Sequence, residues 1–241
     1  MDAMIFAAGL GTRLRPLTDS CPKALIEVGG MTMLQRAIRH VRHAGAERVV
    51  VNVHHHAGMV KEWIAANEPE VIVSDESARL LDTGGGLAAA APLFKRGADI
   101  LVMNADIFTD LELRLLVAAH RGDCTLLTSR RDSSRRLLFD GDGRMQGWLN
   151  MGTGEIRPKE LNDVAALVPL AFGGIHVISP RALAELRKYA AETPDGKFSI
   201  TDFYINRCSG LNIMSYTPAV PFTWIDIGRP STLAQAQSIA H

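Results

Sequence analysis

The run MIFAAGLGTRLRPLT, residues 4–18, decides the fold, and CPKAL, residues 21–25, follows it closely. Its first five residues, 4–8, are apolar and predict a short buried strand. A tight turn comes directly after this strand, because Gly9 and Gly11 can adopt the positive φ angles that such a turn requires. Successive backbone N–H groups in a turn of this kind form a concavity that binds anions. The stretch therefore predicts a strand that ends in an anion-binding loop.

Three cationic side chains stand close to this turn, at Arg13, Arg15 and Lys23. Together with the backbone N–H groups they predict a phosphate-binding site. Two familiar glycine-rich loops do not fit the sequence. A dinucleotide-binding fingerprint needs Gly or Ala three residues after its second glycine, where Leu14 stands. A Walker A loop needs Gly-Lys-Ser/Thr five residues after its first glycine, and Gly9 is not followed by that tripeptide.

Apolar, strand-like segments alternate with helix-like segments along most of the chain. Residues 33–44, for example, carry apolar side chains at helical spacing and end before Gly45, a typical helix stop. This alternation predicts an α/β fold in three layers, with helices on both faces of a mostly parallel, mixed central sheet. In the first half, strands are expected at 47–53, 69–74, 99–103 and 123–129, and further helices at 59–66 and 111–120.

The second half of the chain contains a predicted hairpin and a long, interrupted strand. Residues 137–148 carry Asp142-Gly143 between two strand-like runs, which is the pattern of a β-hairpin. Residues 168–178 predict a strand with a break at Gly173-Gly174. No repeat, linker or change of composition marks a boundary, so we expect one domain over 1–241. Further helices are expected at 181–191, 198–208 and 231–239, and further strands at 211–217 and 223–227.

Composition argues against several classes of function. Lys plus Arg and Asp plus Glu both number 26 in 241 residues, and this balance argues against general nucleic-acid binding and attraction to an anionic membrane. The cysteines Cys21, Cys124 and Cys208 are widely spaced, which favours a reducing compartment over a disulfide framework. Asp2 stands where a signal peptide would carry positive charge, and no apolar run approaches the ~20 residues of a membrane span. We therefore expect a soluble cytoplasmic protein.

Chemically useful residues stand at the ends of several predicted strands, where an open α/β sheet binds its ligands. The run Asp82-Thr83-Gly84-Gly85-Gly86 precedes an Ala-rich helix. Its glycines would let a flat base or a phosphate approach backbone N–H groups, and a flexible turn is the alternative. Asp106 follows the strand at 99–103, where it can cap a helix or bind Mg²⁺, which takes one or two carboxylates plus phosphate oxygens.

The opening stretch resembles the signature of the sugar-phosphate nucleotidylyltransferases, Gly-x-Gly-Thr-Arg-Leu-x-Pro-Leu-Thr followed by Pro-Lys-x-Leu. The matching positions are Gly9, Gly11, Thr12, Arg13, Leu14, Pro16, Leu17, Thr18, Pro22, Lys23 and Leu25. The resemblance implies a Rossmann-like nucleotidyltransferase fold, akin to GT-A, and a reaction in which an NTP and a sugar 1-phosphate give an NDP-sugar and pyrophosphate. It also implies a nucleotide-binding half at about 1–130 and a sugar-phosphate-binding half at about 131–241. The Asp-Thr-Gly-Gly-Gly segment looks like the short single-domain branch that contains N-acetylmuramate-1-phosphate uridylyltransferases.

The resemblance implies roles for individual residues. Arg13 would hold the pyrophosphate leaving group, and Lys23 would bridge the α-phosphate and the attacking sugar phosphate. Asp106 and Asp226 would hold Mg²⁺, although an isolated Asp in the Trp-x-Asp-Ile-Gly segment would usually be a turn residue. Ala105 stands where the family usually has glycine, beside the expected metal. The residues expected at the nucleotide are Ala7, Ala8, Gly9, Gly11, Thr12, Arg13, Asp82, Gly84 and Gly85.

The sugar side of the site is marked by weaker patterns. The run Phe172-Gly173-Gly174-Ile175 resembles the family's stretch that lines the sugar pocket. Many relatives carry Glu-Lys-Pro before it, with the lysine on the sugar phosphate, whereas this chain has Arg157-Pro158-Lys159. The pairs Arg130-Arg131 and Arg135-Arg136 could reach a phosphate, but we expect them to be solvated. The residues expected at the sugar are Asn150, Lys159, Gly174 and Trp224.

The expected substrates are UTP or dTTP and a hexose or amino-sugar 1-phosphate such as N-acetylmuramate 1-phosphate, with Mg²⁺ as the cofactor. Another base specificity, as in a mannose-1-phosphate guanylyltransferase, stays open. Two other classes also stay open. One is a metal-dependent glycosyltransferase, for which Asn104-Ala105-Asp106 gives only part of an Asp-x-Asp motif, and the other is a non-catalytic nucleotide-sugar sensor. We expect no nucleic-acid or membrane partner, and a monomer or small homo-oligomer.

Overall fold

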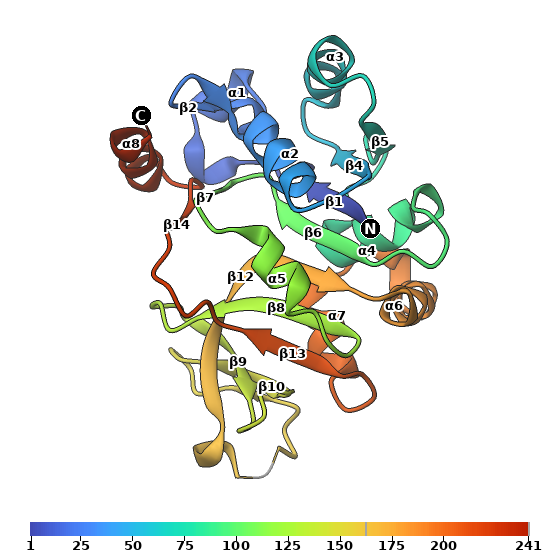
Figure 1. Ribbon diagram of the computed structural model, residues 1–241, viewed down its shortest axis with the longest axis vertical. Coiled ribbons are helices and arrows are strands. Elements are labelled where there is room, and N and C mark those ends of the chain that lie inside the picture. The colour runs from blue at the N-terminus through green and yellow to red at the C-terminus, as the bar shows by residue number, and fades with distance from the viewer. Residues whose placement is uncertain (162, 241) are drawn as a thin grey trace.

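The computed structural model describes residues 1–161 and 163–240, and a central sheet runs through the molecule (Figure 1). One half of this sheet consists of β5 (Ile72–Asp75), β4 (Arg48–Val53), β1 (Asp2–Phe6) and β6 (Ile100–Asn104), in that order. These four strands pair in parallel. Their carboxyl ends therefore meet at one edge of the sheet, where ligands bind in open α/β folds. The loops after β1 and β6 both leave from this edge.

The other half of the sheet is mostly antiparallel. It contains β8 (Cys124–Ser129), β9 (Arg135–Phe139), β10 (Met145–Asn150), β11 (Ile156–Arg157), β12 (Val168–Ile178) and β13 (Ile213–Tyr216). The long strand β12 joins the two halves, because it pairs with β6 on one side and with β8 and β9 on the other. Its pairing with β8 shifts register between Phe172 and His176, and Gly174 has a φ of 69°. The predicted break at Gly173-Gly174 is therefore confirmed.

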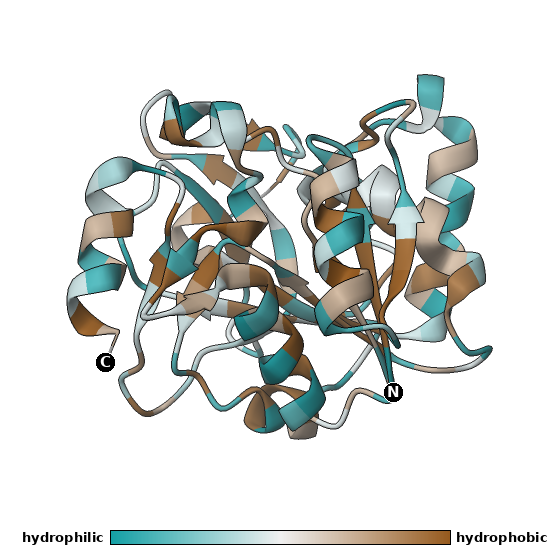
Figure 2. Ribbon diagram, turned by 90° about the horizontal axis from the view of Figure 1, so that it is seen from above, coloured by the Kyte–Doolittle hydropathy of each residue, from teal (hydrophilic) through white to brown (hydrophobic). Residues whose placement is uncertain are grey.

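Helices cover both faces of the sheet. On one face lie α2 (Met33–His43), α3 (Ala57–Asn67) and α5 (Leu113–Ala118), and on the other α4 (Asp82–Ala90), α6 (Pro180–Glu192) and α7 (Ile200–Arg207). Successive residues of a strand point to opposite faces, so Ala3 and Ile5 of β1 pack with the first set and Met4 packs with the second. The central strands are accordingly mostly hydrophobic in Figure 2, between helices of mixed character. The expected three-layer α/β/α fold with a mixed sheet is confirmed.

The segment that follows β13 returns to the N-terminal loop. Its strand β14 (Trp224–Asp226) pairs antiparallel with β7 (Ile107–Thr109), outside the central sheet, and α8 (Pro230–Ile239) comes next. Ile225 and Leu233 from this segment pack in one cluster with Leu14 and Val28. In Figure 1, α8 accordingly lies beside β2 (Glu27–Val28). The N-terminal loop thus forms part of a small core that the C-terminal segment completes.

Short elements complete the described structure. They are β3 (Met31–Thr32), α1 (Leu17–Ser20) and the 3-10 turns η1 (Thr12–Leu14), η2 (Lys23–Leu25), η3 (Ala91–Leu93), η4 (Val164–Ala166) and η5 (Pro194–Gly196). The hairpin of β2 and β3 was not expected, because strands of two residues leave no period in the sequence. Within residues 1–161 and 163–240, no helix is both long and apolar enough to cross a membrane.

Candidate active site

Two carboxylates that are far apart in the sequence lie side by side at the edge of the sheet. Asp106 occupies the turn between β6 and β7, and Asp226 is the last residue of β14. The antiparallel register pairs Asp226 with Ile107, the neighbour of Asp106. The N–H of Ile227 also donates a hydrogen bond to the carbonyl oxygen of Asp106, at 3.0 Å. The pairing of β7 with β14 is therefore what brings these carboxylates together.

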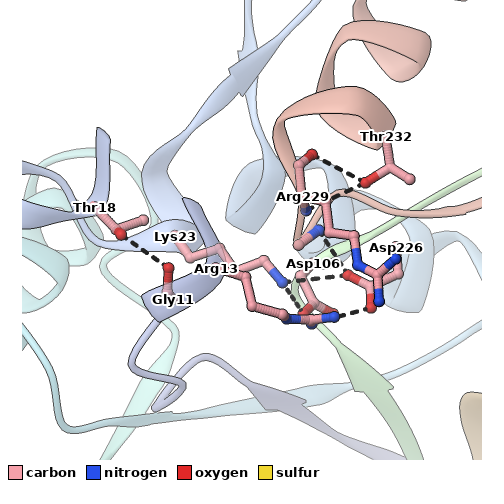
Figure 3. Close-up of polar contacts among 9 residues, drawn as sticks. Gly11, Arg13, Thr18, Lys23, Asp106, Asp226, Arg229 and Thr232 are labelled. Carbon is pink, nitrogen blue, oxygen red and sulfur yellow. Dashed lines mark hydrogen bonds and ion pairs between the residues drawn. The ribbon is translucent and has the colours of Figure 1, made fainter. Parts of the chain in front are cut away.

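The ammonium group of Lys23 lies between the two carboxylates (Figure 3). Its Nζ donates to Oδ2 of Asp106 and, at 3.3 Å, to Oδ1 of Asp226. Only 11% of the Lys23 side chain is exposed. Arg13 approaches the other oxygen of Asp226, with 3.4 Å between its guanidinium nitrogen and Oδ2. Two cations from the N-terminal loop thus meet two carboxylates from distant strands.

This arrangement keeps Asp226 ionised. Burial by itself would raise the pKa of the Asp226 carboxyl, but the charge of Lys23 and a 2.7 Å hydrogen bond from the N–H of Gly228 help to hold the pKa below its usual value. Gly228 also has no room for a side chain. A Cβ there would lie 2.5 Å from a guanidinium nitrogen of Arg13 and 2.9 Å from Nζ of Lys23. The glycine of the Trp-x-Asp-Ile-Gly segment therefore belongs to the site, although it was absent from the expected residues.

The glycine-rich turn has one glycine that the fold requires and one that leaves space open. Gly11 has a φ of 64°, and its carbonyl oxygen accepts a hydrogen bond from Oγ1 of Thr18 at 2.9 Å. A Cβ on Gly11 would lie 2.9 Å from Cγ2 of Thr18. A Cβ on Gly9 would meet no atom within 4 Å among the described residues. Gly9 therefore has free space beside its backbone, as a loop that receives a ligand requires, and Thr12 next to Arg13 is exposed.

A buried polar network supports this turn from behind. The N–H of Ala7 donates to Oδ1 of Asn52 at 2.9 Å, and Nδ2 of Asn52 donates to Oε1 of Glu76 at 2.8 Å. Oε2 of Glu76 accepts the N–H of Leu81 at 3.2 Å, and burial raises the pKa of the Glu76 carboxyl. The network ties the end of β1 to the ends of β4 and β5, while Ala8 is buried beside it. Sequence reasoning missed it, although Asn52 interrupts an otherwise apolar strand.

The triple glycine forms the first turns of α4, which corrects the expectation of free backbone N–H groups there. Gly84 and Gly85 are buried, and both donate to the carbonyl oxygen of Phe198, at 2.9 and 3.2 Å. A Cβ on Gly84 would lie 2.3 Å from the Phe198 ring, and one on Gly85 would lie 2.3 Å from the carbonyl oxygen of Gly196. These glycines therefore permit close packing of α4 on the segment before α7. Asp82, at the start of the helix, stays exposed.

Two adjoining cavities extend from the carboxylates. The first, of about 240 Å³, is lined by Asp106 and Asp226 together with Gly174 and Trp224, two of the residues expected at the sugar. The second, of about 590 Å³, shares Phe172 with the first and holds further polar side chains. Its lining includes Ser133, Arg135, Trp148, Asn150, Glu155, Arg157, Ser199 and Asp202. A ligand that extends from the carboxylates into the second cavity would thus meet a largely polar wall, including Asn150.

One residue expected at the sugar lies away from the two carboxylates, and one residue that was not expected in the site lies beside them. Lys159 lines another cavity, of about 700 Å³, which shares Glu155, Arg157 and Ile205 with the second, polar cavity. None of the residues that line this cavity also lines the cavity beside the carboxylates. The structure therefore does not bring Lys159 to Asp106 and Asp226. Arg131, which we expected to be solvated, instead lines the cavity beside them.

The donor set of Asp106 and Asp226 fits a Mg²⁺ ion. Mg²⁺ is usually bound by one or two carboxylates, and phosphate oxygens of the substrate and water complete its coordination. The described residues contain no group of three or more His, Cys, Asp or Glu side chains that could hold a metal ion. A metal at this place would therefore depend on substrate oxygens, and it would compete with Lys23 for both carboxylates.

Comparison with known proteins gives a consistent picture. Residues 2–130 match the family model described as nucleotidyl transferase. An N-acetylmuramate alpha-1-phosphate uridylyltransferase of Caulobacter vibrioides is 30% identical over 248 residues, covering 98% of this chain and 95% of the relative. Mannose-1-phosphate guanylyltransferase 1 of Arabidopsis thaliana is 26% identical and covers 95% of this chain and 62% of the relative.

Solved structures agree on the fold. The crystal structure of HddC from Yersinia pseudotuberculosis, complexed with GMP-PN, superposes with a TM-score of 0.74 at 20% identity and covers 98% of both chains. At that identity the likeness speaks for the fold alone. The family match covers more than half of the chain, and it contains the glycine-rich turn, Lys23 and Asp106. With the Caulobacter relative aligned over nearly the whole length, the chain belongs to the nucleotidyl transferase family.

Proposed function

We propose that this protein transfers a uridylyl or thymidylyl group from an NTP to a sugar 1-phosphate and releases pyrophosphate. The observation that carries the proposal is the position of Lys23 between Asp106 and Asp226, with Arg13 alongside and an open cavity next to them. Uracil and N-acetylmuramate 1-phosphate are the preferred base and sugar, since the relative from Caulobacter vibrioides carries the name of an N-acetylmuramate alpha-1-phosphate uridylyltransferase.

The reaction needs positioning and positive charge more than an acid–base pair. An oxygen of the sugar phosphate attacks the α-phosphorus of the NTP, a new P–O bond forms, and the bond to the β-phosphate breaks. The attacking phosphate is already ionised at neutral pH, so no protein group has to remove a proton. Lys23, largely shielded from solvent, would hold the attacking and α-phosphate groups together. Arg13, which is more than half exposed beside Asp226, would bind the departing pyrophosphate.

The metal is part of this proposal. Asp106 and Asp226 would hold Mg²⁺, which neutralises charge on the phosphate oxygens when bound. The glycine-rich turn would receive the triphosphate at Gly9, where the backbone has space, and Asn52 and Glu76 would keep the turn in place from behind. The polar second cavity would take the sugar, with Asn150 on its wall.

Three other functions remain distinguishable. A guanylyltransferase is supported by the relative named mannose-1-phosphate guanylyltransferase 1. A glycosyltransferase would use an NDP-sugar as substrate and would release no pyrophosphate. A sensor would bind the nucleotide or nucleotide sugar without turnover, yet the pair Asp106 and Asp226 with Lys23 between them favours a catalyst.

The decisive experiment is a pyrophosphate-release assay with UTP, dTTP, GTP and CTP against the 1-phosphates of N-acetylmuramate, N-acetylglucosamine, glucose and mannose. Mass spectrometry would identify the NDP-sugar formed. We expect the highest kcat/KM with UTP and N-acetylmuramate 1-phosphate. Highest activity with GTP and mannose 1-phosphate would establish the guanylyl alternative, and no pyrophosphate from any pair would refute the transferase proposal.

A further inference from the structure

Arg131 is fixed in the wall of the cavity that contains Asp106 and Asp226. It is the second residue after the end of β8, and its guanidinium donates a 2.7 Å hydrogen bond to the carbonyl oxygen of Phe172 in β12. The guanidinium carbon also lies 4.0 Å from the centre of the Trp224 ring in β14. A cation over an indole face is attracted to it and restrained by it. Two strands from different parts of the chain thus hold this one side chain in place.

The partner of Arg131 is itself fixed. The indole N–H of Trp224 donates to the carbonyl oxygen of Gly173 at 2.9 Å, so the ring cannot turn away without losing a hydrogen bond. Gly173 lies at the break in β12, where a Cβ would meet Cδ2 of Leu127 at 2.9 Å. At the break in the strand, the carbonyl oxygen of Phe172 therefore accepts from Arg131, and the adjacent carbonyl oxygen of Gly173 accepts from Trp224.

The guanidinium of Arg131 is only partly paired with other groups of the protein. Among the described residues its Nε is buried and has no hydrogen-bond partner, and no carboxylate lies within ion-pair distance of its guanidinium. Burial lowers the pKa of Arg131, and the nearby charge of Asp226 opposes that effect. Burying a cation without an anion costs free energy. A half-buried arginine that lines a cavity and has no carboxylate partner is therefore suited to an anionic ligand.

The position of Arg131 indicates which phosphate it would meet. Asp226 contacts Arg13 and lines a cavity with Arg131, and a further cavity is lined by all three residues. Arg13 belongs to the glycine-rich turn, where the triphosphate is proposed to bind. Arg131 lies on the side that opens past Phe172 into the larger, polar cavity. Arg131 therefore lies on the side of the carboxylate pair where the acceptor substrate, the sugar 1-phosphate, is proposed to bind.

We propose that Arg131 binds the phosphate of the sugar 1-phosphate and thereby takes the role that sequence patterns gave to Lys159. The inference rests on the proposed function for the identity of the acceptor, whereas the anion site itself rests on the geometry around Arg131 alone. In this arrangement Lys23 and Arg131 hold the attacking phosphate from two sides, and the carbonyl of Phe172 orients the guanidinium. Arg131 would act mainly on binding of the sugar 1-phosphate, because its guanidinium is held at Phe172, which lines both the cavity beside the carboxylates and the larger polar cavity.

The test uses Arg131→Met, which keeps an apolar stem against Trp224 and removes the charge, and Arg131→Lys, which keeps the charge. Arg130→Met is the matched control, because Arg130 is the adjacent arginine and is exposed. Loss of a charge-assisted hydrogen bond should raise the KM for the sugar 1-phosphate in Arg131→Met by about 10- to 100-fold. The KM for the NTP should change less than about twofold, and Arg131→Lys should recover part of the loss.

Binding without turnover supplies an independent measurement. Inorganic phosphate, titrated in a calorimeter against the nucleotide-free protein, should bind the wild type and Arg130→Met alike and Arg131→Met about 10-fold or more weakly. Equal phosphate binding by Arg131→Met and the wild type would overturn the inference, as would an equal rise of both KM values. If the wild type released no pyrophosphate with any substrate pair, the proposed function would fail, while the phosphate titration would still decide the role of Arg131.

Discussion

Replacing Lys23 by Met should have opposite effects on turnover and on metal binding. The ammonium group occupies the place between Asp106 and Asp226, and only 11% of the side chain is exposed, so water cannot replace its charge fully. For turnover, loss of a preorganised donor to the reacting phosphates should lower kcat by about 10²- to 10³-fold. For metal binding, Mg²⁺ would no longer compete with the ammonium for the two carboxylates.

The size of the metal effect follows from the charges. Two unit charges 4 Å apart interact by about 4 kcal/mol at an effective dielectric constant of 20. The Asp226 side chain is 36% exposed. Screening by solvent therefore reduces the gain to about 1–2 kcal/mol for Mg²⁺ in the variant. This corresponds to about 5- to 30-fold tighter binding of Mg²⁺ to the nucleotide-free protein.

Titration calorimetry with MgCl₂, in parallel with steady-state kinetics, measures both effects. The matched control is Lys61→Met, because Lys61 on α3 is a partly exposed lysine that is paired with Asp75 and lines neither of the two site cavities. Thermal unfolding in MgCl₂ should show that the Lys23→Met protein is folded. Mg²⁺ binding that is unchanged or weaker in Lys23→Met would refute competition for the carboxylates, and turnover within about tenfold of wild type would remove Lys23 from the mechanism.

Three further predictions test other parts of the structure. Asp226→Asn removes one carboxylate of the metal pair, so half-maximal activity should need at least about tenfold more Mg²⁺, and an unchanged Mg²⁺ titration would place the metal elsewhere. Gly9→Ala should leave the melting temperature unchanged and weaken NTP binding, and normal NTP binding by this variant would contradict the proposed phosphate loop. Gly11→Ala should weaken NTP binding and also destabilise the fold by about 1–3 kcal/mol, because Gly11 has a φ of 64° and a Cβ there would lie 2.9 Å from the Thr18 side chain. Burial lowers the pKa of His176 to about 3, so the unfolded chain takes up the proton first and stability should be lost as pH falls from about 6.5 towards 3, by about 2 kcal/mol at pH 5. Denaturant unfolding of His176→Leu should lack that loss, and an equally steep acid limb would show that other groups cause it.

Local patterns predicted the elements of the fold well because each carries its own period. The strand expected at 47–53 is β4 at Arg48–Val53, and the hairpin expected at 137–148 is β9 and β10. The order of the strands could not be predicted in this way. The antiparallel placement of β12 between β6 and β8 depends on side-chain packing between residues that are 42 to 78 positions apart. Nothing in the period of a single strand determines its neighbours.

Sequence motifs predicted the site residues that belong to them. Site residues that become buried only because distant segments pack against them could not be predicted. The motifs led to Lys23, Asp106 and Asp226, which the fold brings together. Arg131 reads as a loop charge in the sequence, and it becomes half-buried only because β12 and β14 pack against it. The glycines of α4 show the same limit. A run of glycines is equally compatible with a loop and with close packing, and the deciding partner, Phe198, is 114 positions from Gly84.

The separate pairing of β14 with β7 has a consequence for how this protein becomes active. The central sheet contains no residue of β14, and the strands before the glycine-rich turn and before Asp106 both precede β14 in the sequence. Only the late segment from β14 to α8 supplies Asp226 and closes the cluster around Leu14. The proposed site is therefore complete only when this last segment of the chain is packed against the N-terminal loop. Proteolytic removal of this segment would take away Asp226, the proposed second metal ligand, and would uncover apolar side chains such as Leu14 and Val28.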